Sequence, residues 1–238
     1  MKKIKPKILG ITLARGGSKS VPKKNIKLLN GKPLIYYTIN EALKSKHLTD
    51  YVVSTDDIEI MKIAAEYGAN VPFKRPDYLS TDTASSVEAL KHAVGFMEET
   101  NSLTYDFVIE LMCTNPLKSV EDIDACIEKL TETRADSVIA VHKLEDHHPN
   151  RIKKIVDDLI VDFCLPEKLE SRRQDLKPNA YIRSGSIYAL KRDELMIYNR
   201  RYGSDHSRPY VLEPYKAVNV DTRIDFLIAE ALLSGKEL

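Results

Sequence analysis

Residues 8–25 read ILGITLARGGSKSVPKKN, and this stretch decides the fold class. The apolar run Ile8–Leu13 is typical of a buried strand, and it passes directly into a loop with two adjacent glycines, Gly16 and Gly17. A strand that is apolar on both faces belongs to a sheet covered by helices on both sides. The loop would then lie at the carboxyl end of the strand, where open α/β sheets bind their ligands.

The same alternation continues along the chain. Further apolar runs at 51–54, 71–73, 106–112 and 137–141 alternate with helical patterns at 33–44, 57–67, 85–99 and 120–133. Strands that alternate with helices predict an α/β fold, with a mostly parallel sheet sandwiched by helices.

The pattern changes near residue 146. Two apolar runs, 151–156 and 159–163, flank Asp157-Asp158 and predict a hairpin, and the polar segment 166–178 has too few apolar residues to pack as a core element. Strand patterns return at 182–190 and 216–220, and an amphipathic helix is predicted over 223–233. We therefore expect a catalytic α/β domain formed by 1–145 and 180–238, with 146–179 as an inserted hairpin and arm.

Composition excludes several classes of protein. The chain has 238 residues, 43% of them hydrophobic, and 36 Lys+Arg against 35 Asp+Glu give a net charge of +1. This balance disfavours nucleic-acid or membrane binding through bulk charge. The sequence shows no apolar run of about 20 residues and no signal-peptide pattern, and its three cysteines form no C-x-x-C pair. A cytoplasmic location is expected.

The loop after the first strand has the chemistry of a phosphate cradle. Glycines let backbone N–H groups approach phosphate oxygens, and Arg15 with three lysines at positions 19, 23 and 24 supplies four positive charges. Ser18 stands where a Walker A loop has glycine, and no G-x-G-x-x-G is present. The plainer alternative is a solvated basic turn.

The loop also resembles a known motif. LARGGSK at 13–19 followed by PKKN at 22–25 is similar to the opening motif of the acylneuraminate cytidylyltransferases, which activate sialic acids and related nonulosonic acids as CMP-sugars. Further motifs occur in the order of that family: VSTD (53–56), RP (75–76), DTASS (82–86), TNPL (114–117), HHP (147–149), RRQD (172–175) and VDT (220–222). The resemblance covers nearly the whole chain and implies a Rossmann-like nucleotidyltransferase fold.

The resemblance also implies roles in binding CTP. It places Arg15, Lys24 and Asp221 in catalysis, and it assigns the nucleotide to Ala14, Gly16, Gly17, Ser18, Lys19, Asn25, Arg75 and Ser86. Asp221 would hold Mg²⁺, and Asn219, which stands where the family commonly has a second aspartate, could offer a neutral oxygen to the same metal. Plainer readings remain open: Arg75 as a surface residue, Ser86 as a first-turn helix residue, and Asp221 as a helix N-cap.

A nonulosonic acid is the second expected substrate. The resemblance and the affinity of arginine for carboxylates assign it to Arg173, Gln174, Arg183 and Ser184. Two departures from the family lie near this pocket: Ser184 replaces an asparagine, and Met112 replaces a glutamine. In the resembled enzymes the polar arm reaches a second subunit, which implies a homodimer.

Other functions remain open. They are a cytidylyltransferase for another 3-deoxy keto-acid sugar, a nucleotide-binding module without catalysis, and a glycosyltransferase. His147 and His148 suggest a metal site, but adjacent side chains of an extended chain point in opposite directions, so a structural role is favoured.

Overall fold

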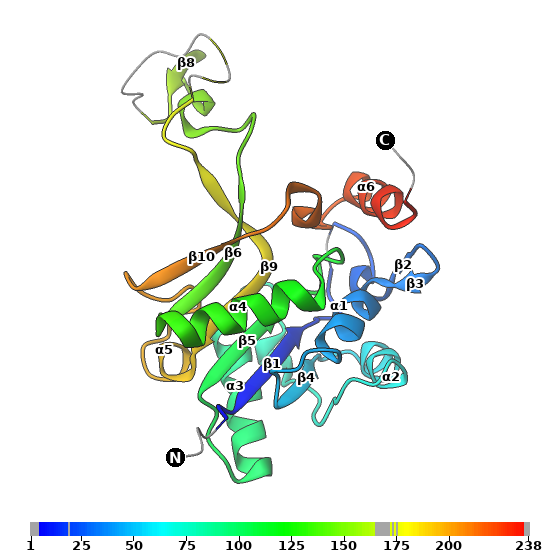
Figure 1. Ribbon diagram of the computed structural model, residues 1–238. Helices are drawn as coiled ribbons and strands as arrows, with labels where there is room; N and C mark the ends of the chain where they lie inside the picture. The colour runs from blue at the N-terminus through cyan, green and yellow to red at the C-terminus, as the bar shows by residue number, and fades with distance from the viewer. Residues whose placement is uncertain (1–4, 19, 165–171, 173, 175, 236–238) are drawn as a thin grey trace.

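The fold is built around a central β-sheet. The computed structural model describes residues 5–18, 20–164, 172, 174 and 176–235. The six strands of the sheet lie in the order β10-β6-β9-β5-β1-β4 (Figure 1). Their bounds are Ile8–Leu13 for β1, Asp50–Ser54 for β4, Phe107–Leu111 for β5, Ser137–Lys143 for β6, Tyr181–Lys191 for β9 and Ser207–Val211 for β10.

The sheet is mixed, although most of its pairings are parallel. Strand β1 runs parallel to β4 and β5, and β10 runs parallel to β6. Strand β9 separates these two groups and runs antiparallel to β5 and β6. The carboxyl ends of β1, β4 and β5 therefore meet at one edge, with β9 beside them.

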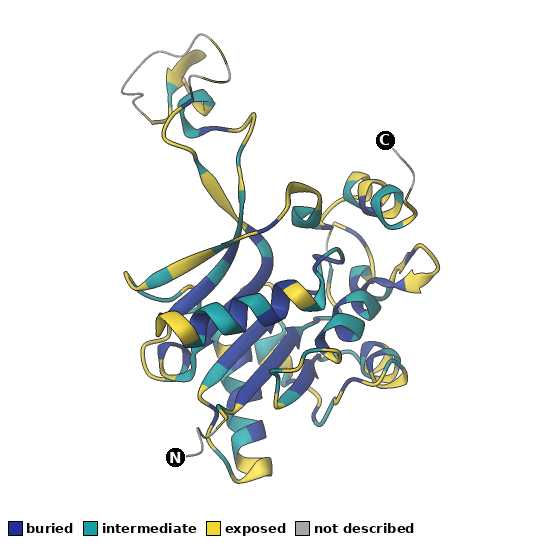
Figure 2. Cartoon of the chain, in the orientation of Figure 1, coloured by how far each residue is buried: buried dark blue, intermediate teal, exposed yellow. Residues whose placement is uncertain are grey.

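Helices cover both faces, as the alternation predicted. One face packs against α1 (Leu34–Ala42), α2 (Ile58–Glu66), α4 (Val120–Thr133) and α6 (Arg223–Leu233), and the other against α3 (Ser86–Asn101) and α5 (Arg192–Met196). Within β1, Ile8 joins the first core, whereas Leu9 and Ile11 join the second. Figure 2 shows the central strands as buried.

Side-chain caps fix where the helices begin. Asp57 caps α2, and Ser85 caps α3 by accepting from Val87 N. Capping boxes begin α4 and α6, the latter formed by Thr222 and Asp225. Both of these helices have the predicted bounds, 120–133 and 223–233.

Three local predictions were wrong. Segment 71–73 is not a strand, and only its neighbours Asn70 and Lys74 form isolated β-bridges. Segment 216–220 is not a strand either, because it contains the end of a 3-10 helix, Pro214–Ala217. Strand β10 was missed because Pro209 interrupts its pattern, which an edge strand tolerates.

The predicted hairpin is present. It consists of β7 (Lys153–Val156) and β8 (Leu159–Asp162), and Asp157 and Asp158 adopt positive φ between them. A second small hairpin pairs β2 (Leu28–Leu29) with β3 (Lys32–Pro33). The β7–β8 hairpin projects away from the sheet on extensions of β6 and β9 (Figure 1). In the described part of the chain, no helix is long and apolar enough to cross a membrane.

A buried lysine supports the turn after β5. Lys118 is 2% exposed, and its ammonium group donates to Thr38 Oγ1 at 2.8 Å, to Met112 O at 2.7 Å and to Asn115 O. Burial lowers the pKa of Lys118 to about 7. The turn that Lys118 holds includes Met112 and Thr114, which line the cavity described below.

The lowered pKa of Lys118 predicts a pH-dependent contribution to stability. Below pH 7 the lysine is protonated in both the folded and the unfolded state. Between about pH 7 and its ordinary pKa near 10.5, the unfolded state binds the extra proton, so the free energy of unfolding rises with pH.

The measurement is urea unfolding of the wild type and of Lys118→Met between pH 6 and pH 9.5. The stability of the wild type relative to the variant should rise above pH 7 by up to about 1.4 kcal/mol per pH unit. Lys44→Met, at an exposed lysine paired with Glu41, is the control and should follow the wild-type profile. Parallel profiles for the wild type and Lys118→Met would contradict the buried titration.

Candidate active site

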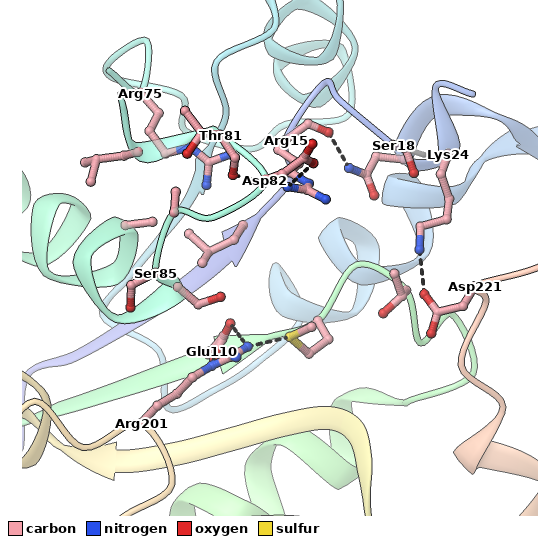
Figure 3. A pocket seen from close by; sticks show the side chains of 18 of the residues that line it. Arg15, Ser18, Lys24, Arg75, Thr81, Asp82, Ser85, Glu110, Arg201 and Asp221 are labelled. Atoms are coloured by element: carbon pink, nitrogen blue, oxygen red, sulfur yellow. Dashed lines mark hydrogen bonds and ion pairs between the residues drawn. The ribbon is translucent and has the colours of Figure 1, made fainter. Parts of the chain in front are cut away.

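A cavity of about 520 Å³ opens at the carboxyl ends of β1 and β5. Its wall comes from the loop after β1, the segment 75–89, the end of β5, Arg201 and Asp221. Figure 3 shows these groups around one space, with the loop after β1 facing the pair formed by Glu110 and Arg201. The fold therefore brings together residues that are up to about 200 positions apart in sequence.

The two glycines of the loop differ in role. Gly16 N donates to Asp56 Oδ1 at 3.1 Å, and a Cβ at Gly16 would lie 2.7 Å from Asp57 Oδ2. A Cβ at Gly17 would have no neighbour within 4 Å. Gly16 is thus required for close packing of the loop against the start of α2, whereas Gly17 borders open space. Ala14 is buried and donates its N–H to Ser54 O.

Several predicted phosphate-binding residues line the cavity. Arg15, Ser18, Lys24 and Asn25 all do so. Arg15 Nη1 lies 3.3 Å from Asp82 Oδ1 and from Thr81 O, and Asn25 holds the loop by donating to Arg15 O at 2.9 Å.

Not every basic residue of the loop faces the cavity. Lys23 differs from Lys24 because its amine pairs with Glu59 on α2. Lys19 lies outside the described residues, so the structure does not place it.

Arg75 and Ser86 come from the segment 75–89 of the cavity wall. Arg75 is 3% exposed, which overturns the surface alternative. Its Nη2 lies 3.4 Å from Asp56 Oδ1 and its Nε donates to Ser80 Oγ at 3.0 Å. Burial lowers the pKa of Arg75, and Asp56 opposes this shift. Ser86 is the first residue of α3, and it also lines the cavity.

Asp221 faces the loop after β1. Its Oδ1 accepts from Lys24 Nζ at 2.6 Å (Figure 3), and its Oδ2 accepts from Asn219 Nδ2 at 2.8 Å. Thr222, not Asp221, caps α6, so the carboxylate of Asp221 is not used as the cap. Asn219 presents its amide nitrogen to Asp221, while its oxygen is buried beside Gly185 without a partner.

The donor set around Asp221 fits a cation that takes most of its ligands from substrate and water. No group of three or more His, Cys, Asp or Glu side chains within the described ranges could enclose a metal ion. One carboxylate at the edge of a wide cavity is sufficient for Mg²⁺ when phosphate oxygens complete the coordination. The buried Thr114 Oγ1, beside the same cavity, also lacks a partner.

The predicted sugar-binding residues that the structure describes, Gln174, Arg183 and Ser184, do not line this cavity. Arg173 is outside the described residues, and Gln174 lines a separate, smaller cavity in the arm. Arg183 is exposed and stacks on the ring of Tyr202 at 3.8 Å. Ser184 is buried and donates to Ala140 O, where the register between β6 and β9 shifts, so its hydroxyl has a structural role within the chain.

His148 is a structural residue, as favoured from the sequence. Its Nε2 lies 2.8 Å from Pro178 O and its Nδ1 accepts from Asn150 N, so both ring nitrogens hold the base of the arm.

Two residues that line the cavity, Glu110 and Arg201, were not predicted from the sequence. Glu110 of β5 is 1% exposed and forms a two-pronged ion pair with Arg201, with both N–O distances at 2.7 Å. Burial raises the pKa of Glu110, and Arg201 opposes this shift. The one available signal was an acidic residue within the apolar run FVIEL, which requires a buried cation as its partner.

The chain matches known proteins over almost its whole length. A family model described as "Cytidylyltransferase" matches residues 9–236. Pseudaminic acid cytidylyltransferase of Campylobacter jejuni is 34% identical over 95% of this chain and 96% of the relative. CMP-N,N'-diacetyllegionaminic acid synthase of Legionella pneumophila is 32% identical over 95% and 96%.

A further relative carries a different kind of name. It is the "Post-translational flagellin modification protein B" of Campylobacter coli, 34% identical over 97% of each chain. Among solved structures, a CMP:2-keto-3-deoxy-manno-octonic acid synthetase complexed with CTP aligns with a TM-score of 0.70 at 19% identity, over 97% of this chain and 100% of that one. This likeness confirms the nucleotidyltransferase fold. The family match, the relatives and the fold agree: the chain belongs to the cytidylyltransferase family.

Proposed function

We propose that this protein transfers CMP from CTP to the anomeric hydroxyl of a nonulosonic acid and releases pyrophosphate. The observation that carries the proposal is the cavity, whose lining brings Arg15, Ser18 and Lys24 of the loop after β1 together with Arg75 and Ser86. Relatives named for pseudaminic, legionaminic and N-acylneuraminic acids are 32–34% identical to this chain. Their names supply the substrate class, and the cavity supplies the groups that such a reaction needs.

The charges support one orientation of CTP. The triphosphate would lie along the loop after β1, where Gly17 leaves open space and Lys24 supplies a cation. The cytosine would lie near Arg75 and Ser86. Attack at the α-phosphorus spreads negative charge over its oxygens and the departing pyrophosphate, and preorganised cations stabilise that charge.

Asp221 is the proposed Mg²⁺ ligand. A bound Mg²⁺ would neutralise phosphate oxygens and orient them for displacement. The protein's own part is positional: Lys24 and Asn219 fix the Asp221 carboxylate from two sides. The acceptor hydroxyl then attacks directly, and no cavity residue is needed as a nucleophile.

The relatives favour nonulosonic acids over the eight-carbon alternative. The octonic acid synthetase shares the fold at 19% identity, whereas the relatives named for nonulosonic acids are 32–34% identical over nearly the full chain. Retention of Arg15, Lys24 and Asp221 in one cavity disfavours a module without catalysis.

The arm supports a proposed homodimer. Ile155 and Ile160 pair across β7 and β8 and are 78% and 77% exposed, and Phe163 nearby is 63% exposed. A projecting hairpin with this much exposed apolar surface is typical of a protein interface. A second copy of the chain is the partner that the family resemblance implies. A cytoplasmic location stays a prediction.

Pyrophosphate release tests the function. CTP should give release with one of pseudaminic, legionaminic or N-acetylneuraminic acid, and ATP, GTP and UTP should not. Lys24→Ala should then lower kcat by about a hundredfold or more, because a cation that stabilises the leaving group is lost. Lys23→Ala is the matched control and should keep near-wild-type kcat, since Lys23 pairs with Glu59 outside the cavity. Equal activity of both variants would remove Lys24 from the mechanism.

Asp221→Asn tests the metal role. The variant should need at least tenfold more Mg²⁺ for half-maximal rate, and calorimetry should show weaker Mg²⁺ binding in the presence of CTP. Asp193→Asn, at an exposed aspartate outside the cavity, controls for the loss of charge. An unchanged Mg²⁺ titration would leave Asp221 as a partner of Lys24 alone.

The dimer proposal predicts a change of mass. Light scattering should give twice the mass of one chain for the wild type and the mass of one chain for Ile155→Asp with Ile160→Asp, because two charges enter the apolar surface. Leu227→Asp places a charge on the exposed face of α6 and should leave the mass unchanged. A dimeric hairpin variant would show that another surface pairs the subunits.

A further inference from the structure

The proposed function leaves one wall of the cavity without an assigned ligand. The loop after β1 and Asp221 serve the triphosphate, and the segment 75–89 serves the base. The remaining lining residues include Met112, Thr114 and the pair formed by Glu110 and Arg201. Figure 3 shows this pair opposite the loop after β1. The sugar acid must therefore meet this wall while its anomeric hydroxyl reaches the α-phosphorus.

Arg201 is held rigidly at this wall. Its Nε and Nη2 donate to the two oxygens of Glu110, Nη2 also contacts Met112 Sδ at 3.3 Å, and Nη1 donates to the hydroxyl of Tyr202 at 3.0 Å. The guanidinium also lies near the rings of Tyr188 and Tyr202, at 5.2 and 5.3 Å from their centroids. Its orientation is therefore fixed before any substrate binds.

The donors that remain decide what Arg201 can recognise. A guanidinium has five N–H groups, and the contacts above use four of them within the described residues. A guanidinium has two edges that can bind a carboxylate through two N–H groups. Glu110 occupies the Nε–Nη2 edge, and Met112 Sδ takes the remaining N–H of Nη2, which belongs to the Nη1–Nη2 edge. The substrate carboxylate would also bring a second anion close to Glu110. One N–H on Nη1 remains, and a single donor suits a neutral carbonyl oxygen.

The side chain next to Arg201, Met112, favours a ligand that has an apolar part beside the carbonyl. Met112 borders the same wall and offers a flexible apolar surface. An acylamido group combines a carbonyl acceptor with an apolar methyl group. Pseudaminic, legionaminic and N-acylneuraminic acids all carry such groups.

We propose that Arg201 binds the acylamido group of the sugar acid through its carbonyl oxygen, with Met112 against the acyl methyl group and Glu110 positioning the guanidinium. This inference rests on the proposed function. It assigns substrate selection to the ion pair of Glu110 and Arg201, and neither residue was predicted as a site residue.

The test compares two acceptors. One is the nonulosonic acid with the highest turnover, and the other is the same acid with a hydroxyl in place of an acylamido group, each such group being replaced in turn. The wild type should prefer the acylated acid in kcat/KM. Arg201→Lys should raise the KM of the acylated acid roughly tenfold to hundredfold and reduce that preference, while the KM of CTP stays within about twofold.

Arg200→Lys is the matched control. Arg200 is the adjacent arginine, pairs with the buried Glu194 and stacks near Tyr198, but it does not line the cavity. It should keep the wild-type preference. A double variant, Glu110→Met with Arg201→Met, removes both buried charges together, which limits the risk of unfolding, and should lose the preference as well.

Glu110→Gln tests the positioning role. Glutamine keeps the shape but offers one acceptor oxygen, so the KM of the acylated acid should rise while the KM of CTP does not. A purely structural Glu110 would lower the melting temperature and leave the acceptor preference unchanged.

The outcomes separate the two levels of the proposal. If the wild type releases pyrophosphate with a nonulosonic acid and Arg201→Lys keeps the acceptor preference, this inference is wrong and the function stands. An equal rise in the KM of both acceptors would also overturn it, because Arg201 would then bind a group common to both, such as the carboxylate. If the wild type uses no nonulosonic acid, the proposed function and the inference are both wrong.

Discussion

A single carboxylate, Asp56, joins the loop after β1 to the segment that carries Arg75. Its Oδ1 accepts from Gly16 N at 3.1 Å and lies 3.4 Å from Arg75 Nη2. Gly16 belongs to the loop that carries the cations proposed to bind phosphate, and Arg75 is the residue proposed to lie beside the base. Because Asp56 follows β4, the neighbour of β1 in the sheet, the sheet places this carboxylate beside the loop after β1.

Asp56 also explains why the cavity has a fixed shape before a ligand enters. Arg75 is buried at 3% exposure, and an arginine at this depth needs an anion nearby. The Gly16 N–H is used in the same contact, so the phosphates would be bound mainly by side-chain cations and by the loop beyond Gly16. Gly16 is therefore needed for packing, whereas Gly17 leaves space that a ligand can enter.

Sequence reasoning predicted most of the fold because the apolar periodicity was strong. The helices 120–133 and 223–233 agree with the predicted bounds, since capping boxes mark their starts. Strand β10 and the loss of a strand at 216–220 were not predictable from the pattern, because pairing at a sheet edge depends on tertiary contacts.

The residues proposed to bind the nucleotide could be predicted from motifs, but the pair formed by Glu110 and Arg201 could not. Arg15, Lys24 and Arg75 lie in recognisable motifs, and all three line the cavity. Glu110 and Arg201 are 91 positions apart, and only the pairing of β5 with β9 brings their neighbourhoods together. A long-range ion pair of this kind leaves no local pattern in one sequence.

The route by which the chain enters and leaves the arm has a further consequence. Strands β6 and β9 are hydrogen-bonded neighbours up to Lys143 and Tyr181, so the segment between them begins and ends at adjacent points of the sheet. Such a segment can change in length or sequence without altering any crossover connection of the core. The arm and the cavity can therefore diverge independently: the arm is a module that evolution can exchange while the cavity stays constant.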